Sequence, residues 1–278
     1  MMSSYENYSK TSASYDTTRP PQGLEVIREA LSTNAVPLKT QVLLDAGCGT
    51  GQYTAALIND VAQITAIDLN EAMLSAAKEK LHGETESGRL VFQQASLEAL
   101  PIDAQSVDAI MVNQVLHHIA DDPDTHWLGH QRVFAEFARV LKPGGMIVIN
   151  SCSHVQLRSG FWFYQLIPNA IERICRRTCD PTVIAELLQA VGFSQTRHAV
   201  NPQIVMQDAS YFSAQGVFDP NWRSGDSIWA LATPDELQVA LEEAAQLGEA
   251  GELDSFMRHH DAKRQSVGQL TFSSAQRL

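Results

Sequence analysis

The sequence predicts a doubly wound α/β fold built on a mostly parallel β-sheet. Short runs of Val, Ile, Leu and Ala alternate with longer segments of helical periodicity through residue 150. Strands that are apolar on both faces are typical of parallel sheets covered by helices on both sides. A glycine-rich loop at 47–51 follows the first apolar run, and a Lys-Pro-Gly-Gly turn at 142–145 precedes the fifth.

The alternation begins after a polar N-terminal stretch that stops at Pro20-Pro21. Leu24, Ile27 and Leu31 then recur at helical spacing and predict a first helix. Asn70 is in the position of an N-cap for a helix that carries apolar residues as far as Leu81. We predict strands at 41–46, 64–68, 90–92, 107–112 and 146–149, and further helices at 52–59 and 130–141.

Beyond Asn150 the alternation weakens. We expect an aromatic-rich helical segment at 161–167, a helix at 181–190 closed by Gly192, a sixth strand at 194–200, a helix near 235–247 and a last strand at 269–275. The predicted organisation has three parts: an N-terminal arm at 1–22, a core at 23–202 that continues in 266–278, and a helical, aromatic insertion at 203–265.

Composition narrows the class of protein. The chain has 278 residues and a formal net charge of −12, so it lacks the overall basic surface of a nucleic-acid binder. The N-terminus is rich in Ser and Tyr with no apolar signal-peptide core, and no run is long enough to span a membrane. We expect a cytoplasmic protein with a small-molecule partner; a homodimer is left open.

The stretch from Val42 to Tyr53 joins an apolar strand to a helix through Gly47, Gly49 and Gly51. Such a loop lets a nucleotide approach the backbone at the start of a helix. A dinucleotide fingerprint would place its third glycine at position 52, which is Gln52, and the carboxylate of Asp45 would repel a pyrophosphate. These two residues disfavour a nicotinamide-dependent oxidoreductase and favour a nucleotide that carries an ammonium group and no phosphate.

The loop resembles motif I of the class I S-adenosylmethionine (SAM)-dependent methyltransferases. Asp68 at the end of the second strand, the Leu100-Pro101 loop and the segment 141–145 resemble the same family, in particular its ubiquinone/menaquinone-biosynthesis group, as does the N-terminal segment 14–20. The resemblance implies a seven-stranded Rossmann-like methyltransferase sheet whose last strand is antiparallel, with helical cap insertions. It further implies SAM as the methyl donor and no metal.

The resemblance also assigns parts of SAM to residues of this chain. Asp45 and Gly47 would hold the ammonium group and Arg19 the carboxylate. Asp68 would accept both ribose hydroxyls, as an acidic residue in that register also does in dinucleotide-binding folds. Ser96 is in the place of the aspartate that contacts adenine in the family, so this hydrogen bond would lack charge assistance. The remaining expected cofactor residues are Cys48, Gly49, Gly51, Leu69, Met73, Leu97 and Asn113.

The resemblance places the segment 113–119 beside the methionine part of SAM and the acceptor. His118 or His117 is the candidate general base, since a neutral imidazole suits that role near neutral pH. Tyr15 would close over the methyl group. The expected acceptor-contacting residues are Tyr8, Tyr15, His117, Phe161, Trp162, Tyr164 and Trp222, although aromatics of this kind also serve as packing.

The expected function is therefore transfer of a methyl group from SAM to a small molecule by in-line displacement. Carbon or oxygen methylation of an apolar or aromatic metabolite is preferred. One alternative is a SAM-binding regulator without catalysis. Another is an arsenite or thiol methyltransferase, suggested by Cys152, Cys175 and Cys179, although cysteine is also a common small core residue.

Overall fold

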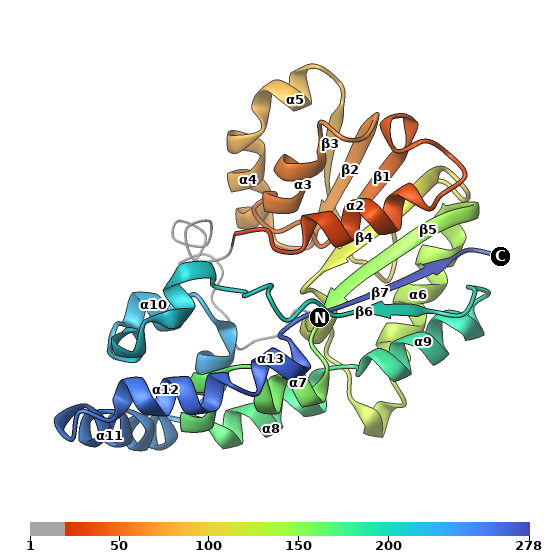
Figure 1. The fold of residues 1–278 in the computed structure, drawn as a ribbon. Coiled ribbons are helices and arrows are strands. Elements are labelled where there is room, and N and C mark those ends of the chain that lie inside the picture. The colour runs from red at the N-terminus through yellow and green to blue at the C-terminus, as the bar shows by residue number, and fades with distance from the viewer. Residues whose placement is uncertain (1–19) are drawn as a thin grey trace.

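Seven strands form one sheet in the order β3-β2-β1-β4-β5-β7-β6, in a computed structural model that describes residues 20–278 (Figure 1). The strands are β1 (Val42–Ala46), β2 (Gln63–Asp68), β3 (Leu90–Gln94), β4 (Val107–Asn113), β5 (Leu141–Ser151), β6 (Arg197–Ala199) and β7 (Thr271–Gln276). Strands β1 to β5 are parallel, whereas β7 runs antiparallel to both β5 and β6. The predicted doubly wound fold with an antiparallel last strand is confirmed.

The parallel register brings polar strand ends together at one edge of the sheet. Asp68 pairs with Gln94, and Asn113 pairs with Asn150. The strand order reverses between β1 and β4. The chain first adds β2 and β3 on one side of β1, and then adds β4 and β5 on its other side. Ligands of open α/β sheets bind at such a switch point, outside the carboxyl ends of the strands.

Helices cover both faces of the sheet. Neighbouring residues of a strand point to opposite faces, so each face carries apolar side chains that a layer of helices buries. Leu43 belongs to a buried cluster with helices α2, α3 and α4, whereas Leu44 belongs to one with α6 and α9. The bounds are α2 (Leu24–Ser32), α3 (Gln52–Leu57), α4 (Glu71–Lys80), α6 (Leu128–Val140) and α9 (Pro181–Ala190); the short elements η1 (Leu38–Thr40), α5 (His82–Glu86), η2 (Leu116–His118) and η3 (Pro123–Thr125) connect them. Asn70 caps α4 as predicted, with its side chain accepting from the backbone N–H of Ala72 and Met73.

The start of β5 differs from the prediction. The residues 142–145 end α6 as expected, but they lie inside β5 and do not form a separate turn. The reason is pairing with the C-terminus of the chain. The Gly144 N–H donates to the Arg277 carbonyl at 2.8 Å, and the Arg277 N–H donates to the Gly145 carbonyl at 2.9 Å.

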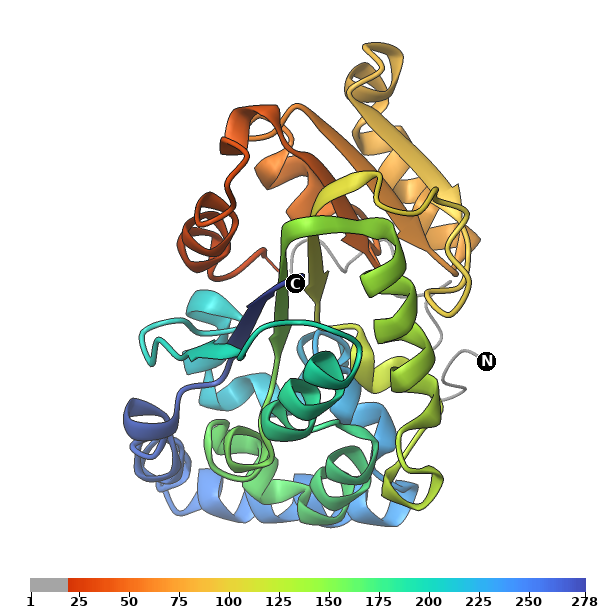
Figure 2. The same cartoon turned by 90° about the vertical axis from the view of Figure 1, so that its right-hand side faces the viewer.

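The remaining helices lie together beyond the carboxyl ends of the strands, and we call this unit the cap (Figures 1 and 2). It consists of α7 (His154–Ser159), η4 (Trp162–Leu166), α8 (Pro168–Arg177), η5 (Asp208–Phe212), η6 (Ala214–Phe218), α10 (Pro220–Ser224), η7 (Ser227–Leu231), α11 (Pro234–Glu249), α12 (Leu253–Asp261) and α13 (Arg264–Val267). No helix within residues 20–278 has the length and apolar character needed to cross a bilayer.

The cap therefore draws on two segments, residues 154–177 as well as the predicted insertion at 203–265. Aromatic packing joins them: the Phe163 ring stacks on Trp229 with centroids 5.9 Å apart, and the Ala170 N–H donates to Glu236 at 2.9 Å. Helix α9 lies between the two segments in sequence, yet packs on the sheet beside α6.

Candidate active site

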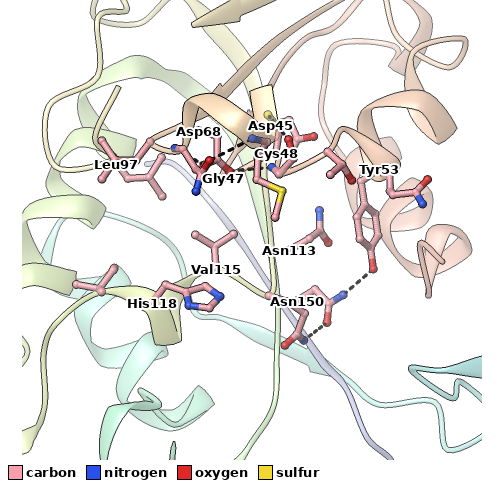
Figure 3. Close-up of a pocket in the computed structure, with 18 of the residues that line it drawn as sticks. Asp45, Gly47, Cys48, Tyr53, Asp68, Leu97, Asn113, Val115, His118 and Asn150 are labelled. Carbon is pink, nitrogen blue, oxygen red and sulfur yellow. Dashed lines mark hydrogen bonds between the residues drawn. The ribbon is translucent and has the colours of Figure 1, made fainter. Parts of the chain in front are cut away.

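The main cavity opens at the switch point, between the carboxyl ends of β1 and β4 and the cap (Figure 3). Residues from the strand ends and the loops that follow them form most of its wall, and Met206 and Leu270 close it from the cap side. The predicted residues that line it are Asp45, Gly47, Cys48, Gly49, Asp68, Leu69, Met73, Ser96, Leu97, Asn113 and His118. The fold thus brings these predicted residues together from the ends of separate strands.

Gly47 allows two loops to approach each other closely. Its φ is +81°, and a Cβ added to it would lie 2.4 Å from Cγ2 of Val115, the residue that follows β4 by two positions. The N–H groups of Gly47 and Cys48 both donate to the Ile67 carbonyl, at 2.8 and 2.9 Å. The loop is therefore held between β2 and β4 and cannot accept a side chain at this position without movement.

Gly51 has a different role from the one predicted. It is the N-cap of α3 in the left-handed conformation, and a Cβ there would meet Ala77 at 3.2 Å and Leu81 at 3.3 Å. It does not line the main cavity. The expectation that Gly51 contacts the cofactor is corrected: it lets α3 pack closely on α4.

Asp45 is a buried carboxylate in the cavity wall. It is 1% exposed, and its Oδ2 accepts a hydrogen bond of 2.5 Å from the Thr54 hydroxyl. Burial raises the pKa of Asp45 to about 7, with Thr54 opposing the shift and the nearby Asp68 carboxylate adding to it. The ionised form of Asp45 is costly without a cationic partner.

Asp68 ends β2 and faces the same cavity (Figure 3). Its Oδ2 accepts from the Gly49 N–H and its Oδ1 from the Asn70 N–H, both at 2.8 Å. Burial raises the pKa of Asp68, and these backbone hydrogen bonds oppose the increase. A carboxylate has about four acceptor positions, so both oxygens retain capacity for ligand hydroxyls.

Ser96 and Leu97 lie where the loop after β3 meets the cavity. The Ser96 hydroxyl oxygen accepts the Glu98 N–H at 3.2 Å, so it shapes the loop and still has its own proton to donate. Glu98 also lines the cavity and pairs with Arg132 at 2.6 Å. Sequence reasoning did not select Glu98, because its position after the turn becomes meaningful only once the loop folds over the cavity.

A row of hydrogen-bonded polar side chains along the wall was also missed. The Tyr53 hydroxyl donates to the Gln22 carbonyl at 3.0 Å and accepts from Asn150 Nδ2 at 3.2 Å. Asn150 Oδ1 in turn accepts from Gln114 Nε2 at 3.1 Å (Figure 3). All four residues line the cavity. The sequence does contain a signal for these residues, because each of two apolar strands ends in a polar residue.

Asn113 contributes an unusual group to this wall. Its Nδ2 is buried and has no hydrogen-bond partner among residues 20–278. A buried donor without a partner costs free energy, on the order of 1–3 kcal/mol. Such a donor, in the wall of a cavity, is suited to a ligand oxygen.

The two adjacent histidines lie in η2 with ring centroids 4.1 Å apart, but they line different cavities. His118 faces the main cavity, whereas His117 lines a smaller neighbouring cavity. Both remain candidates for contact with an acceptor.

The aromatic residues predicted to contact the acceptor mostly pack inside the cap. Phe161 and Trp162 are fully buried, and the Trp162 indole donates to the Tyr211 carbonyl at 2.9 Å. The Trp222 ring covers Gly216 and lies 6.2 Å from the Trp162 ring. None of these three lines either cavity, so the expectation for them is corrected; Tyr164 does line the smaller cavity.

The remaining predicted residues, Tyr8, Tyr15 and Arg19, lie outside the residues that the structure describes. The described chain starts at the cavity, which Pro20 and Gln22 line.

The cysteines do not form the thiolate set that a metalloid would need. Cys152 and Cys179 line the smaller cavity without Cys175, and residues 20–278 contain no group of three or more His, Cys, Asp or Glu side chains arranged to hold a metal. Burial raises the pKa of Cys175 to about 11 and also raises that of Cys179. Protonated thiols are poor nucleophiles and ligands.

The residues of the main cavity fit SAM. Its described lining contains Asp45, Asp68 and Glu98 but no Lys or Arg, which suits a ligand with an ammonium and a sulfonium and opposes a pyrophosphate. Leu69, Met73 and Leu97 provide apolar surface beside Asp68 for a base. The unpartnered amide of Asn113 provides a donor for a ligand oxygen.

Comparison with known proteins supports the same cofactor. Residues 44–149 match the methyltransferase domain family. The chain is 27% identical over 212 residues to a demethylmenaquinone methyltransferase of Clavibacter sepedonicus, covering 69% of this chain and 82% of that protein. It is 29% identical over 133 residues to a ubiquinone biosynthesis O-methyltransferase of Coxiella burnetii, covering 48% of this chain and 53%, about half, of that relative.

A solved structure has the same fold over most of the chain. It is described as a methyltransferase from an antibiotic biosynthesis pathway of Anabaena variabilis, with a TM-score of 0.73 at 20% identity, covering 94% of this chain and 100% of that one. The matched domain, the order of the strands in the sheet and the glycine-rich loop all indicate a methyltransferase. The chain is a SAM-dependent methyltransferase with the class I fold, and it is similar to enzymes of ubiquinone and menaquinone biosynthesis.

Proposed function

We propose that the enzyme methylates a carbon or oxygen atom of a small apolar or aromatic molecule. The observation that carries this proposal is the lining of the main cavity, which combines Asp68 at the sheet edge with His118 and with the apolar side chains of Met206 and Leu270. Such a lining offers polar groups for the donor and apolar surface for a small acceptor in one cavity. The names of the quinone-biosynthesis relatives support an acceptor of this size and polarity.

The cofactor residues act by binding and orientation. SAM, when bound, supplies a methyl group activated by its sulfonium. In the proposal, ionised Asp45 and the Gly47 backbone hold the ammonium, Asp68 accepts from the ribose hydroxyls and Asn113 Nδ2 donates to a ligand oxygen. Fixing two reactants in line contributes on the order of 7–11 kcal/mol in well-aligned systems.

His118 is the proposed general base. It lines the cavity on the acceptor side, where a neutral imidazole would take the proton of an acceptor hydroxyl as the oxygen attacks. Apolar side chains such as Met206 and Leu270 would exclude water from this region. Replacing His118 by Gln would lower turnover while leaving SAM binding intact.

Incubation with methyl-labelled SAM and a metabolite extract tests the proposed activity. We expect formation of S-adenosylhomocysteine together with a labelled product of low mass, identified by mass spectrometry. If SAM binds but neither product forms with any extract, the protein is a SAM-binding regulator and the proposed activity is wrong. Label found only in protein would show a macromolecular acceptor.

The raised pKa of Asp45 predicts opposite effects of pH on SAM affinity and on stability. Because only the ionised carboxylate attracts the ammonium, SAM affinity should fall about tenfold per pH unit below the Asp45 pKa of about 7. The ligand-free protein should show the reverse trend. A carboxyl whose folded pKa is raised stabilises the fold at low pH, and this contribution is lost as pH rises through about 7.

Calorimetric titration with SAM between about pH 6 and pH 8, with thermal unfolding of the free protein, measures both trends. Asp45→Asn should bind SAM more weakly and lose most of the pH dependence. Titration with 5′-methylthioadenosine, which lacks the ammonium, is the ligand control. An equal SAM affinity of the wild-type protein across this range would contradict the assigned role of Asp45.

A further inference from the structure

A second, smaller cavity adjoins the main one on the cap side. Its volume is about 30 Å³, enough for about two water molecules and too small for an acceptor molecule. Among the residues that the structure describes, Gln114, Val115 and Met206 line both cavities. We call these three residues the partition, because they lie between the main cavity and the small space behind it.

Two residues of the partition are tied to the cofactor side of the site. Gln114 has a φ of +54°, which is uncommon for a residue with a side chain. The Gln114 N–H donates to the Asn150 carbonyl at 2.9 Å, and Gln114 Nε2 donates to Asn150 Oδ1 at 3.1 Å. Val115 lies so close to Gly47 that a Cβ added there would be 2.4 Å from Val115 Cγ2. A replacement of Gln114 or Val115 would therefore also move the wall or the glycine-rich loop of the proposed SAM site.

Met206 is the member of the partition that the cap contributes, and its backbone is fixed. The Met206 N–H donates to Gln269 Oε1 at 2.8 Å. Gln269 is fully buried, and its Nε2 donates at 3.0 Å to the carbonyl of Gly160, the residue that ends α7. The next residue, Leu270, also lines the main cavity. One amide side chain thus joins both cap segments to the chain that enters β7, and it fixes the point at which the Met206 side chain starts.

The Met206 side chain, in contrast, can be shortened without removing these hydrogen bonds. Methionine is unbranched and packs through apolar contacts, with three non-hydrogen atoms beyond its Cβ. Leu157, Ile174 and Ile228 give the space behind Met206 an apolar surface. Removal of the three atoms would join that space to the main cavity. The joined cavity would have room for about five more non-hydrogen atoms, about three in place of the side chain and about two in the smaller cavity.

We propose that Met206 is the specificity-determining residue that limits the length of the acceptor. An acceptor seated in the main cavity ends against Met206, and a longer apolar substituent would need the space that the Met206 side chain fills. Apolar pockets discriminate by about 10–200-fold between groups that differ by one methylene. This assignment rests on the proposed methyl transfer to an acceptor that lies against Met206 and Leu270.

Acceptors of graded length test the proposal. The acceptor that the full chain methylates most in a metabolite extract is first identified from its labelled product. Homologues of this acceptor are then prepared with alkyl groups of about one to four carbons at each position remote from the methylated atom. Met206→Ala should use at least one of the longer homologues at least tenfold better than the wild-type protein does, measured as kcat/KM. The SAM dissociation constant should stay within about twofold of wild type.

Met257→Ala is the matched control. Met257 belongs to α12 of the cap and packs against the same apolar cluster as Met206, but it lines neither cavity. This control should rank the homologues as the wild-type protein does. Met206→Val removes less of the side chain and serves as the second variant if Met206→Ala does not fold; its gain on the same homologue should be smaller.

The two proposals fail in different ways. The same ranking of the homologues by the wild-type protein and by a folded Met206→Ala or Met206→Val variant would overturn the role of Met206 while leaving methyl transfer established. Absence of SAM binding by the wild-type protein, or of S-adenosylhomocysteine with any extract, would instead refute the proposed function on which this assignment rests.

Discussion

Asp68→Ala is expected to lower the affinity for SAM at least 100-fold. In the proposed arrangement the variant removes two charge-assisted hydrogen bonds to the ribose hydroxyls. Each contributes about 1.5–3 kcal/mol, and about 1.4 kcal/mol corresponds to a tenfold change in affinity. It also releases the Gly49 N–H from its 2.8 Å hydrogen bond and so loosens the loop that lies beside the ligand. Isothermal titration calorimetry with SAM measures the effect.

The matched control for this variant is Asp103→Ala. Asp103 is an exposed carboxylate in the loop between β3 and β4, outside the main cavity, so the change in net charge is the same. Its SAM affinity should remain within about twofold of wild type, well below the effect of one hydrogen bond. Wild-type affinity of a folded Asp68→Ala variant would show that the ribose is held elsewhere.

Gly47→Ala should destabilise the protein by about 2–5 kcal/mol. A left-handed conformation costs about 1–2 kcal/mol for a residue with a Cβ, and forcing a methyl group into a packed contact costs about 1–3 kcal/mol more. The new Cβ would lie 2.4 Å from Val115 Cγ2, so either the glycine loop or the segment after β4 must move. SAM affinity should fall with stability, because both segments line the cavity. Chemical denaturation of the ligand-free protein measures the change.

Gly49→Ala measures the cost of the left-handed backbone conformation without the steric clash that Gly47→Ala adds. Gly49 also has a positive φ, +53°, but a Cβ there would meet no atom within 4 Å, so we expect a loss of only about 1–2 kcal/mol. In a double-mutant cycle, Val115→Ala should recover part of the stability lost in Gly47→Ala. Equal stabilities of the two glycine variants would refute the clash as the cause.

The cofactor side of the site was largely predictable because its signals are local. A strand, a glycine loop and a helix start within about a dozen residues contain Asp45, Gly47 and Gly49, and the fold class follows from the alternation of apolar runs. The fold class and the methyl donor are confirmed. The role of Gly51 was not predictable in the same way, since it depends on where α4 packs.

The acceptor side depends on contacts between residues far apart in sequence. Asn150 meets Gln114 across 36 positions, through the register of β4 with β5, and it meets Tyr53 of α3 across 97 positions, through the packing of α3 beside the sheet. The periodicity of 161–167 shows that aromatic side chains share a segment, but not whether a cavity or another ring covers them. In the structure the Trp162 ring lies 6.2 Å from the Trp222 ring and its indole donates to the Tyr211 carbonyl, so Trp162 and Trp222, which the sequence suggested as acceptor contacts, pack inside the cap.

The cap is built from two separate segments of the chain, and this affects how such an enzyme can evolve a preference for a new acceptor. The chain passes from sheet to cap after β5, returns for α9 and β6, enters the cap again at η5 and returns for β7. A cap of this kind cannot be exchanged between proteins as one continuous segment. Each of its two segments is joined at both ends to elements that belong to the sheet and its covering helices. We therefore expect new acceptor preferences to arise by replacement of residues on the cap's inner surface, with the donor loop unchanged.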